Sequence, residues 1–182
     1  MIKIFDDIIP EYFQDFICNF ITGKTEGNPY PLHYMDNLTF GGDSTIHGYE
    51  VGFGSNFFSE RRIMHIGGPL LTPLFLFLNS QKLILRELIH GKVFLQIPNT
   101  CLDHPQEYKL HKDQHYDHLV MLYYATDTDG DTYFYNDKEG KDIITQVSPK
   151  KGRIVFFDGN IWHSGSNTTK DLRIVLNYNF LI

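Results

Sequence analysis

The sequence has few cysteines, no excess of positive charge and no long apolar run, and each shortage narrows the class of protein. Two cysteines among 182 residues, Cys18 and Cys101, are too few and too far apart to suggest a disulfide framework or a thiolate metal site. A formal net charge of −6 gives no electrostatic reason to expect nucleic acid as a partner. So few cysteines favour a reducing compartment, and we expect the protein in the cytoplasm.

A segment long enough to cross a bilayer is also missing. The most apolar stretch, residues 69–90, is interrupted by polar residues from Asn79 onward, well short of the roughly 20 apolar residues that a span requires. The first residues become acidic at Asp6, which is too early for a secretory signal. We therefore expect no membrane association.

Aromatic residues are plentiful, with 15 phenylalanines and 11 tyrosines, and such rings favour pleated sheets. Apolar residues at helical spacing predict a helix over 10–21, with Pro10 in its first turn and Gly23 after its end. A second helix is expected over about 69–90, with Gly91 as its stop. Residues 22–56 are rich in Gly, Asn, Pro and Asp and are expected to form loops or short strands.

From residue 92 onward, short β-type runs alternate with turn clusters, which predicts a series of strands. The runs are 92–97, 119–124, 132–135, 143–147, 153–157 and 172–180. Helices followed by short strands predict a mainly β protein, an antiparallel barrel or sandwich buttressed by N-terminal helices. With no repeat or linker, residues 1–182 form one predicted domain, in which about 1–91 supply helical support and a lid and about 92–182 supply the core.

A histidine–x–aspartate pair, His111-Lys112-Asp113, stands just before the predicted strand 119–124. In a strand, residues i and i+2 point to the same face, so both side chains can project into one barrel mouth. His163 follows strand 153–157, and Arg173 lies ten residues later near the start of the last strand. We expect these two strands to pair as antiparallel neighbours and to bring Arg173 beneath the metal. Two imidazoles and one carboxylate are the ligands of the non-haem Fe(II) oxygenases.

These residue types suit one particular chemistry. Two neutral imidazoles and one carboxylate leave Fe(II) with a net charge near +1, so a 2-oxo acid can chelate it while one position stays open for O₂. The far carboxylate of 2-oxoglutarate then requires a cation, and the fork of Arg173 matches a carboxylate in bidentate fashion. Tyr124 could add a hydroxyl hydrogen bond at that end.

Simpler explanations exist for each residue taken alone. Nine histidines and 22 acidic residues make about one histidine–x–acid pair expected by chance, and His115-Tyr116-Asp117 is a second such pair in this chain. His111 and Asp113 could be surface loop residues, His163 a strand-end histidine, and Arg173 a solvent-facing strand residue. The ordered set, placed among the predicted strands, is much harder to obtain by accident.

At these residues the sequence resembles the 2-oxoglutarate/Fe(II) oxygenase superfamily, in particular its prolyl-4-hydroxylase-like branch with small phage and bacterial members. The resemblance covers about residues 92–180 and rests on four motifs: residues 111–124, Asp129-Gly130-Asp131-Thr132, residues 151–163, and Arg173. It implies a double-stranded β-helix, or jelly roll.

The resemblance also implies the site residues and cofactors. The residues that match iron ligands are His111, Asp113 and His163. Those that match the co-substrate site are Arg173, for the 5-carboxylate of 2-oxoglutarate, with Tyr124 and Thr132 beside it. Fe(II) and 2-oxoglutarate are the implied cofactors, with ascorbate as a candidate reductant.

Departures from the family pattern narrow the chemistry further. Asp113 occupies a position that a halogenase leaves vacant for halide, which favours hydroxylation. Asn179 stands six residues after Arg173, where the nucleic-acid demethylases carry a second arginine. Val175 replaces the serine or threonine of many relatives, so part of the co-substrate pocket differs.

The leading hypothesis is therefore a 2-oxoglutarate-dependent dioxygenase. It would hydroxylate a C–H bond of a peptidyl substrate, for example a prolyl residue, or of a small molecule, with release of succinate and CO₂. One alternative is a non-catalytic metal-binding jelly-roll module. Another is a zinc hydrolase with the same ligands, in which Arg173 and Tyr124 would have no task. Residues 25–68 are expected to form the lid and wall of the site. Neither the substrate nor the oligomeric state follows from these residues.

Overall fold

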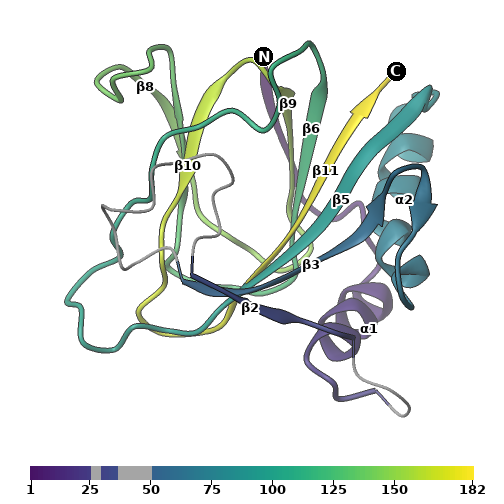
Figure 1. The fold of residues 1–182 in the computed structure, drawn as a ribbon, viewed down its shortest axis with the longest axis horizontal. Coiled ribbons are helices and arrows are strands. Elements are labelled where there is room, and N and C mark those ends of the chain that lie inside the picture. The colour runs from purple at the N-terminus through teal and green to yellow at the C-terminus, as the bar shows by residue number, and fades with distance from the viewer. Residues whose placement is uncertain (26–29, 37–50) are drawn as a thin grey trace.

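The structure, a computed structural model, describes residues 1–25, 30–36 and 51–182. Two antiparallel sheets face each other, and the helices lie on the outer side of the larger sheet (Figure 1). The larger sheet contains, in order, β1 (Ile2–Phe5), β9 (Ile154–Asp158), β6 (Leu119–Tyr124), β11 (Arg173–Leu181), β5 (Glu87–Gln96), β3 (Gly52–Ser59) and β2 (His33–Met35), with β4 (Arg62–Ile63) paired to β3. The smaller sheet contains β10 (Trp162–Gly165), β7 (Thr132–Tyr135) and β8 (Ile143–Val147). This is the jelly-roll core that the sequence predicts.

The central strands of the larger sheet contribute to two different cores, because successive side chains of a strand point to opposite faces. In β6, Leu122 and Tyr124 point into the space between the two sheets, whereas Met121 and Tyr123 pack on the helix side. Strand β11 alternates in the same way. Burial on both faces explains why these two strands are continuous apolar runs in the sequence.

The first predicted helix is confirmed as α1 (Glu11–Ile21), whose Ile17 and Ile21 are buried against the larger sheet. Pro10 occupies the N-cap position of this helix. Gly23, just beyond its end, has a φ of 71°, a left-handed conformation that glycine adopts without strain.

The second predicted helix is wrong in its second half. A 3₁₀ turn, η1 (Gly68–Leu71), leads into α2 (Thr72–Gln81), and Lys82 ends the helix with a left-handed φ of 55°. The following residues alternate: Leu83 and Leu85 pack on the core, while Ile84 is 85% exposed. Such alternation belongs to an extended chain, and β5 begins five residues after Lys82.

Gly91 therefore stops no helix. It lies within β5, where a Cβ atom would stand only 2.3 Å from Cε2 of the buried Phe57 ring. The glycine is required by close packing between neighbouring strands rather than by a turn.

The expected pairing between the strands that precede His163 and contain Arg173 is also wrong. Strand β11 pairs with β5 and β6, whereas β9 pairs with β6 and β1, so β6 separates them. The sequence missed β10, which carries His163 itself. The segment expected as lid contributes β2, β3 and β4 to the larger sheet, and its Asn37, His47 and Tyr49 fall outside the described residues.

Candidate metal and co-substrate site

The two histidines of the predicted triad meet through one backbone pair. His111 and His163 form an isolated antiparallel bridge, in which His111 N–H donates to the His163 carbonyl at 2.9 Å and the reverse bond measures 3.0 Å. Directly opposed residues of an antiparallel pair point to the same face, so the two imidazole centroids lie 4.6 Å apart. The expectation that His111 and Asp113 share a face assumed strand geometry at 111–113; the structure has this single bridge followed by a bend.

Asp113 lies close to both imidazole rings and supplies the third side chain of the triad. One carboxylate oxygen lies 3.9 Å from Nε2 of His111, and the other lies 3.9 Å from Nε2 of His163. Asn177 on β11 donates an amide hydrogen to Asp113 Oδ2 at 3.0 Å, and Asn179 approaches the same oxygen at 3.4 Å. Burial raises the Asp113 pKa, but the nearby histidines and the Asn177 hydrogen bond outweigh it and hold that pKa below its usual value. The carboxylate is therefore ionised at neutral pH.

Each histidine is held by its other ring nitrogen. Nδ1 of His111 lies 3.1 Å from the Lys109 carbonyl, and Nδ1 of His163 lies 3.0 Å from the Ile161 carbonyl. A carbonyl accepts only from an N–H, so the proton sits on Nδ1 and the lone pair of Nε2 faces Asp113. Burial, reinforced by the charge of His111, lowers the His163 pKa to about 4. His163 is thus a neutral imidazole at physiological pH.

These donors fit a divalent iron. One ligand atom from each of His111, Asp113 and His163 lies within 4.8 Å of the other two, and among the described residues no other such cluster occurs. The separations of 3.9 Å are too long for hydrogen bonds, yet a cation between the atoms would bridge them. Two imidazoles and one carboxylate on one face are the donor set of non-haem Fe(II) sites.

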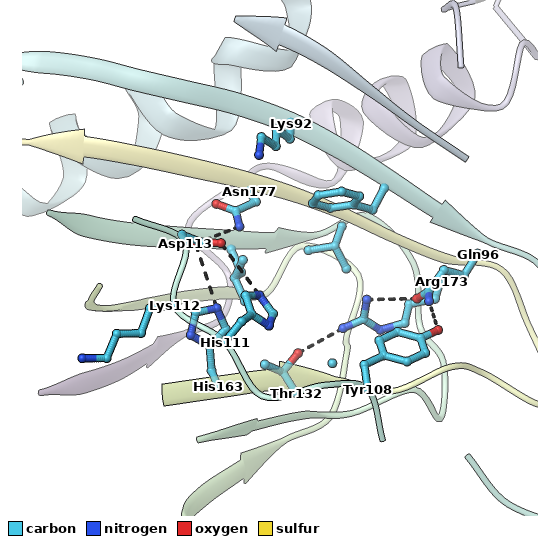
Figure 2. Close-up of a pocket in the computed structure, with 14 residues that line it drawn as sticks. Lys92, Gln96, Tyr108, His111, Lys112, Asp113, Thr132, His163, Arg173 and Asn177 are labelled. Carbon is cyan, nitrogen blue, oxygen red and sulfur yellow. Dashed lines mark hydrogen bonds and ion pairs between the residues drawn. The ribbon is translucent and has the colours of Figure 1, made fainter. Parts of the chain in front are cut away.

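Arg173 lies in the same cavity as the triad, toward its other end (Figure 2). The residue is 7% exposed, and the three hydrogen bonds that its guanidinium donates all go to neutral oxygens. Nε donates to the Gly130 carbonyl at 2.7 Å, Nη1 to Gln96 at 3.2 Å and Nη2 to Thr132 at 3.0 Å. Within the described ranges, no carboxylate forms an ion pair with this guanidinium. A buried cation held only by neutral groups is suited to receive an anion from outside the protein.

The surroundings of Arg173 explain the Asp-Gly-Asp-Thr turn. A Cβ atom on Gly130 would lie 2.7 Å from Cδ of Arg173, so only glycine lets the guanidinium reach the Gly130 carbonyl. Thr132 lines the cavity, whereas Tyr124 is fully buried behind it and donates its hydroxyl hydrogen to Thr132 Oγ1 at 2.7 Å. Tyr124 therefore contacts Arg173's partner and would act on the co-substrate only through Thr132.

The cavity residues that the sequence did not reveal include Gln96, Tyr108 and Asn177. Gln96 bridges Arg173 and the Tyr108 hydroxyl, and Tyr108 lines the cavity near Arg173 (Figure 2). Asn177 could have been found by counting alternate residues from Arg173 along β11, because 173, 175 and 177 share a face. Gln96 and Tyr108 carry no comparable periodic signal.

The rival pair His115 and Asp117 does not join the triad. Both residues are exposed, and Asp117 accepts a hydrogen bond from the side chain of Asn160 at 2.8 Å. The metal-binding group contains His111, Asp113 and His163 and neither of these two.

Comparison with known proteins agrees with this arrangement. Residues 96–181 match the model of the 2OG-Fe(II) oxygenase superfamily. A search of the curated proteins gives no match. The structure is similar to the viral collagen prolyl hydroxylase vCPH from Paramecium Bursaria Chlorella virus-1 in its 2OG complex, with 17% identity and a TM-score of 0.58 over 98% of this chain and 93% of that one.

Two further solved structures share the fold. A prolyl-4-hydroxylase from Pseudomonas putida has 12% identity and a TM-score of 0.62 over 100% of this chain and 92% of that one. A prolyl hydroxylase from Trichoplax adhaerens, solved with a hypoxia inducible factor peptide fragment, has 10% identity and a TM-score of 0.68 over 99% and 83%.

The chain matches the 2OG-Fe(II) oxygenase superfamily over residues 96–181, and the solved structures share its fold over nearly the whole chain. It is a 2-oxoglutarate-dependent dioxygenase, and Fe(II) and 2-oxoglutarate are the cofactors of that class. No helix within the described ranges is both long and apolar enough to span a membrane.

Proposed function

We propose that the protein hydroxylates a C–H bond of a peptidyl or small-molecule substrate, with His111, Asp113 and His163 holding Fe(II) and Arg173 holding 2-oxoglutarate. The observation that carries this proposal is the placement of a buried, anion-free arginine and a two-histidine, one-carboxylate cluster in one cavity. Bound iron and 2-oxoglutarate supply the oxidising chemistry with O₂, giving succinate and CO₂.

The protein's own residues would bind the iron and 2-oxoglutarate and keep the binding groups in a fixed orientation. The Nδ1 hydrogen bonds of His111 and His163 keep both Nε2 lone pairs directed at one point. Asn177 fixes the rotation of the Asp113 carboxylate, and Thr132 and Gln96 fix the plane of the guanidinium. The apolar side chains of Val175 and Leu122 line the cavity between the two ends and exclude water from the reacting groups.

The presence of an aspartate at position 113 favours hydroxylation over halogenation, because it fills the coordination position that halide would need. A peptidyl substrate is supported by the prolyl hydroxylases that share the fold, one of which was solved with a peptide. This support is an analogy, because proteins that share one fold act on many different substrates.

Anaerobic protein mixed with Fe(II) and 2-oxoglutarate should develop a weak visible charge-transfer band, and aerobic incubation should release succinate. Replacement of His111 by alanine should abolish both signals. A wild-type protein that binds Fe(II) but forms no band with 2-oxoglutarate would exclude the proposal. A band without succinate, under any substrate tested, would instead favour the non-catalytic metal-binding module.

A further inference from the structure

The cavity floor is a ladder of side chains from β11 and β5, whose antiparallel register places particular residues side by side. Alternate residues of both strands face the cavity, so each facing pair forms one rung. Three rungs line it: Arg173 with Gln96, Val175 with Phe94, and Asn177 with Lys92. The ladder thus has a cation at each end and an apolar rung between them.

The two cations lie at opposite ends of the cavity floor, and the triad's carboxylate lies at the Lys92 end. Asn177 donates to Asp113, so the rung that contains Lys92 is the one beneath the metal-binding group. Asn177 lies four positions after Arg173 along β11, a distance of roughly 14 Å along a strand. Figure 2 shows Arg173, Gln96 and Tyr108 gathered at one end, and Lys92 beside Asn177 and Asp113 at the other. Among the described residues, the following pair, His90 and Asn179, does not line the cavity.

The charges of the cavity wall do not balance. The described residues that line it include three cations, Lys92, Lys112 and Arg173, and one carboxylate, Asp113. Fe(II) contributes two positive charges and 2-oxoglutarate two negative charges, so the loaded cavity keeps the same excess of positive charge. A partly buried excess of this kind is stabilised by a bound anion.

Lys112 and Lys92 differ in how their charge is accommodated. The Lys112 ammonium lies 5.0 Å from the centre of the Trp162 ring, where the aromatic face stabilises it, and in Figure 2 its side chain points away from Arg173. Lys92 is held further inside: burial lowers its pKa, and the charge of Asp113 opposes that shift. An additional carboxylate beside Lys92 would offset the same cost of burial.

We propose that Lys92 binds an anionic group of the primary substrate, so that the substrate is a small carboxylic acid hydroxylated near its carboxylate, rather than an internal residue of a peptide. This inference rests on the proposed function, because it takes the Arg173 end to be filled by 2-oxoglutarate. The carboxylate that Lys92 receives has a second conceivable source, the metal-side carboxylate of 2-oxoglutarate, and the experiment separates the two.

The test uses the full-length protein loaded anaerobically with Fe(II), in the wild type and in Lys92→Met, Lys92→Arg and Lys112→Met. Calorimetry first measures the Kd of 2-oxoglutarate. The complex is then titrated with free amino acids, hydroxy acids and dicarboxylic acids, each paired with its neutral carboxamide, and binding is followed by ligand-observed NMR. Lys112→Met removes an equal charge from the same cavity and is therefore the matched control.

Hydrogen bonds to charged groups contribute about 1.5–3 kcal/mol, so we expect at least one acid to bind about tenfold or more tightly than its amide in the wild type. Lys92→Met should reduce that preference to less than about twofold, Lys92→Arg should retain part of it, and Lys112→Met should retain it in full. The Kd of 2-oxoglutarate in Lys92→Met should stay within about threefold of the wild type. Unchanged co-substrate binding also demonstrates that the variant is folded.

Each other outcome overturns the inference. A tenfold weaker 2-oxoglutarate affinity in Lys92→Met would mean that Lys92 serves the co-substrate. An acid preference that survives in Lys92→Met, or no acid preference in the wild type, would mean that the substrate carries no anion to this position and would favour an internal peptide residue. If the wild type fails to bind 2-oxoglutarate at all, the proposed function fails first, and that result is distinct from the others.

Discussion

Replacing Arg173 by methionine tests the co-substrate site most directly. Methionine keeps much of the side-chain volume but removes the fork that contacts Gly130, Gln96 and Thr132. Because the guanidinium is only 7% exposed, a carboxylate paired with it is desolvated on both sides. Removing one partner of such a pair typically costs about 2–5 kcal/mol, which weakens binding between about thirty-fold and several thousand-fold.

The assay is calorimetric titration of 2-oxoglutarate into protein loaded anaerobically with Fe(II). Arg173→Met should raise the Kd at least thirty-fold, whereas Arg173→Lys should recover part of the loss, because it keeps the charge and loses the planar fork. Arg153→Met is the matched control: that arginine pairs with Asp6 at 2.8 Å, outside the cavity. Iron affinity, measured in the same samples, separates a lost contact from a lost fold.

A change of less than about threefold in the Kd of Arg173→Met would refute the assignment of Arg173 to the co-substrate. An equal loss in Arg153→Met would refute it as well, since the effect would then come from general loss of positive charge. Weaker iron binding in Arg173→Met would show that the substitution disturbs the triad.

Three further predictions concern the metal ligands and the sheet. Asn177→Leu should weaken Fe(II) binding about 10- to 100-fold in a chelator competition, because the Asp113 carboxylate loses the amide that orients it; unchanged affinity would exclude that role. Gly91→Ala should lower the free energy of unfolding by about 1–3 kcal/mol in urea, since the new methyl group meets the Phe57 ring; an unaltered midpoint would refute the packing argument. The metal-free protein should lose stability as pH falls from about 6.5 toward 4. The His163 pKa is lowered by burial to about 4, so the folded state binds fewer protons than the unfolded state in that window. The loss should reach at most about 3 kcal/mol and should be smaller in His163→Gln; an equal loss in that variant would assign the effect to other groups.

Short β-type runs bounded by turn residues made most of the strands predictable from the sequence. The runs at 119–124, 132–135 and 143–147 coincide with β6, β7 and β8, because two-sided burial or turn residues mark their limits. The second helix was overextended at residues 82–90, where leucines and isoleucines fit a helix and a strand equally well. The left-handed Lys82 and the exposed Ile84 decide between them only once the tertiary packing is known.

The site was predictable as a set of residue types, and less so as a geometry. His111, Asp113 and His163 do gather, but through one bridge between an irregular segment and β10 rather than through the strands that the sequence predicted. Arg173 reaches the cavity by alternation along β11, not by pairing with β9. Gln96 and Tyr108 depend on contacts between distant segments, which leave no local pattern in the sequence.

The chain between β5 and β6, residues 97–118, has no regular strand and yet carries two of the three proposed iron ligands. Its backbone hydrogen bonds to the rest of the protein include those from Asn99 to Thr168 and from Tyr108 to Gly165, and the pair between His111 and His163. An ion bound by ligands from both this segment and β10 would hold the two together. Loading the iron should therefore slow amide hydrogen exchange along the segment, which also carries Tyr108 at the co-substrate end of the cavity.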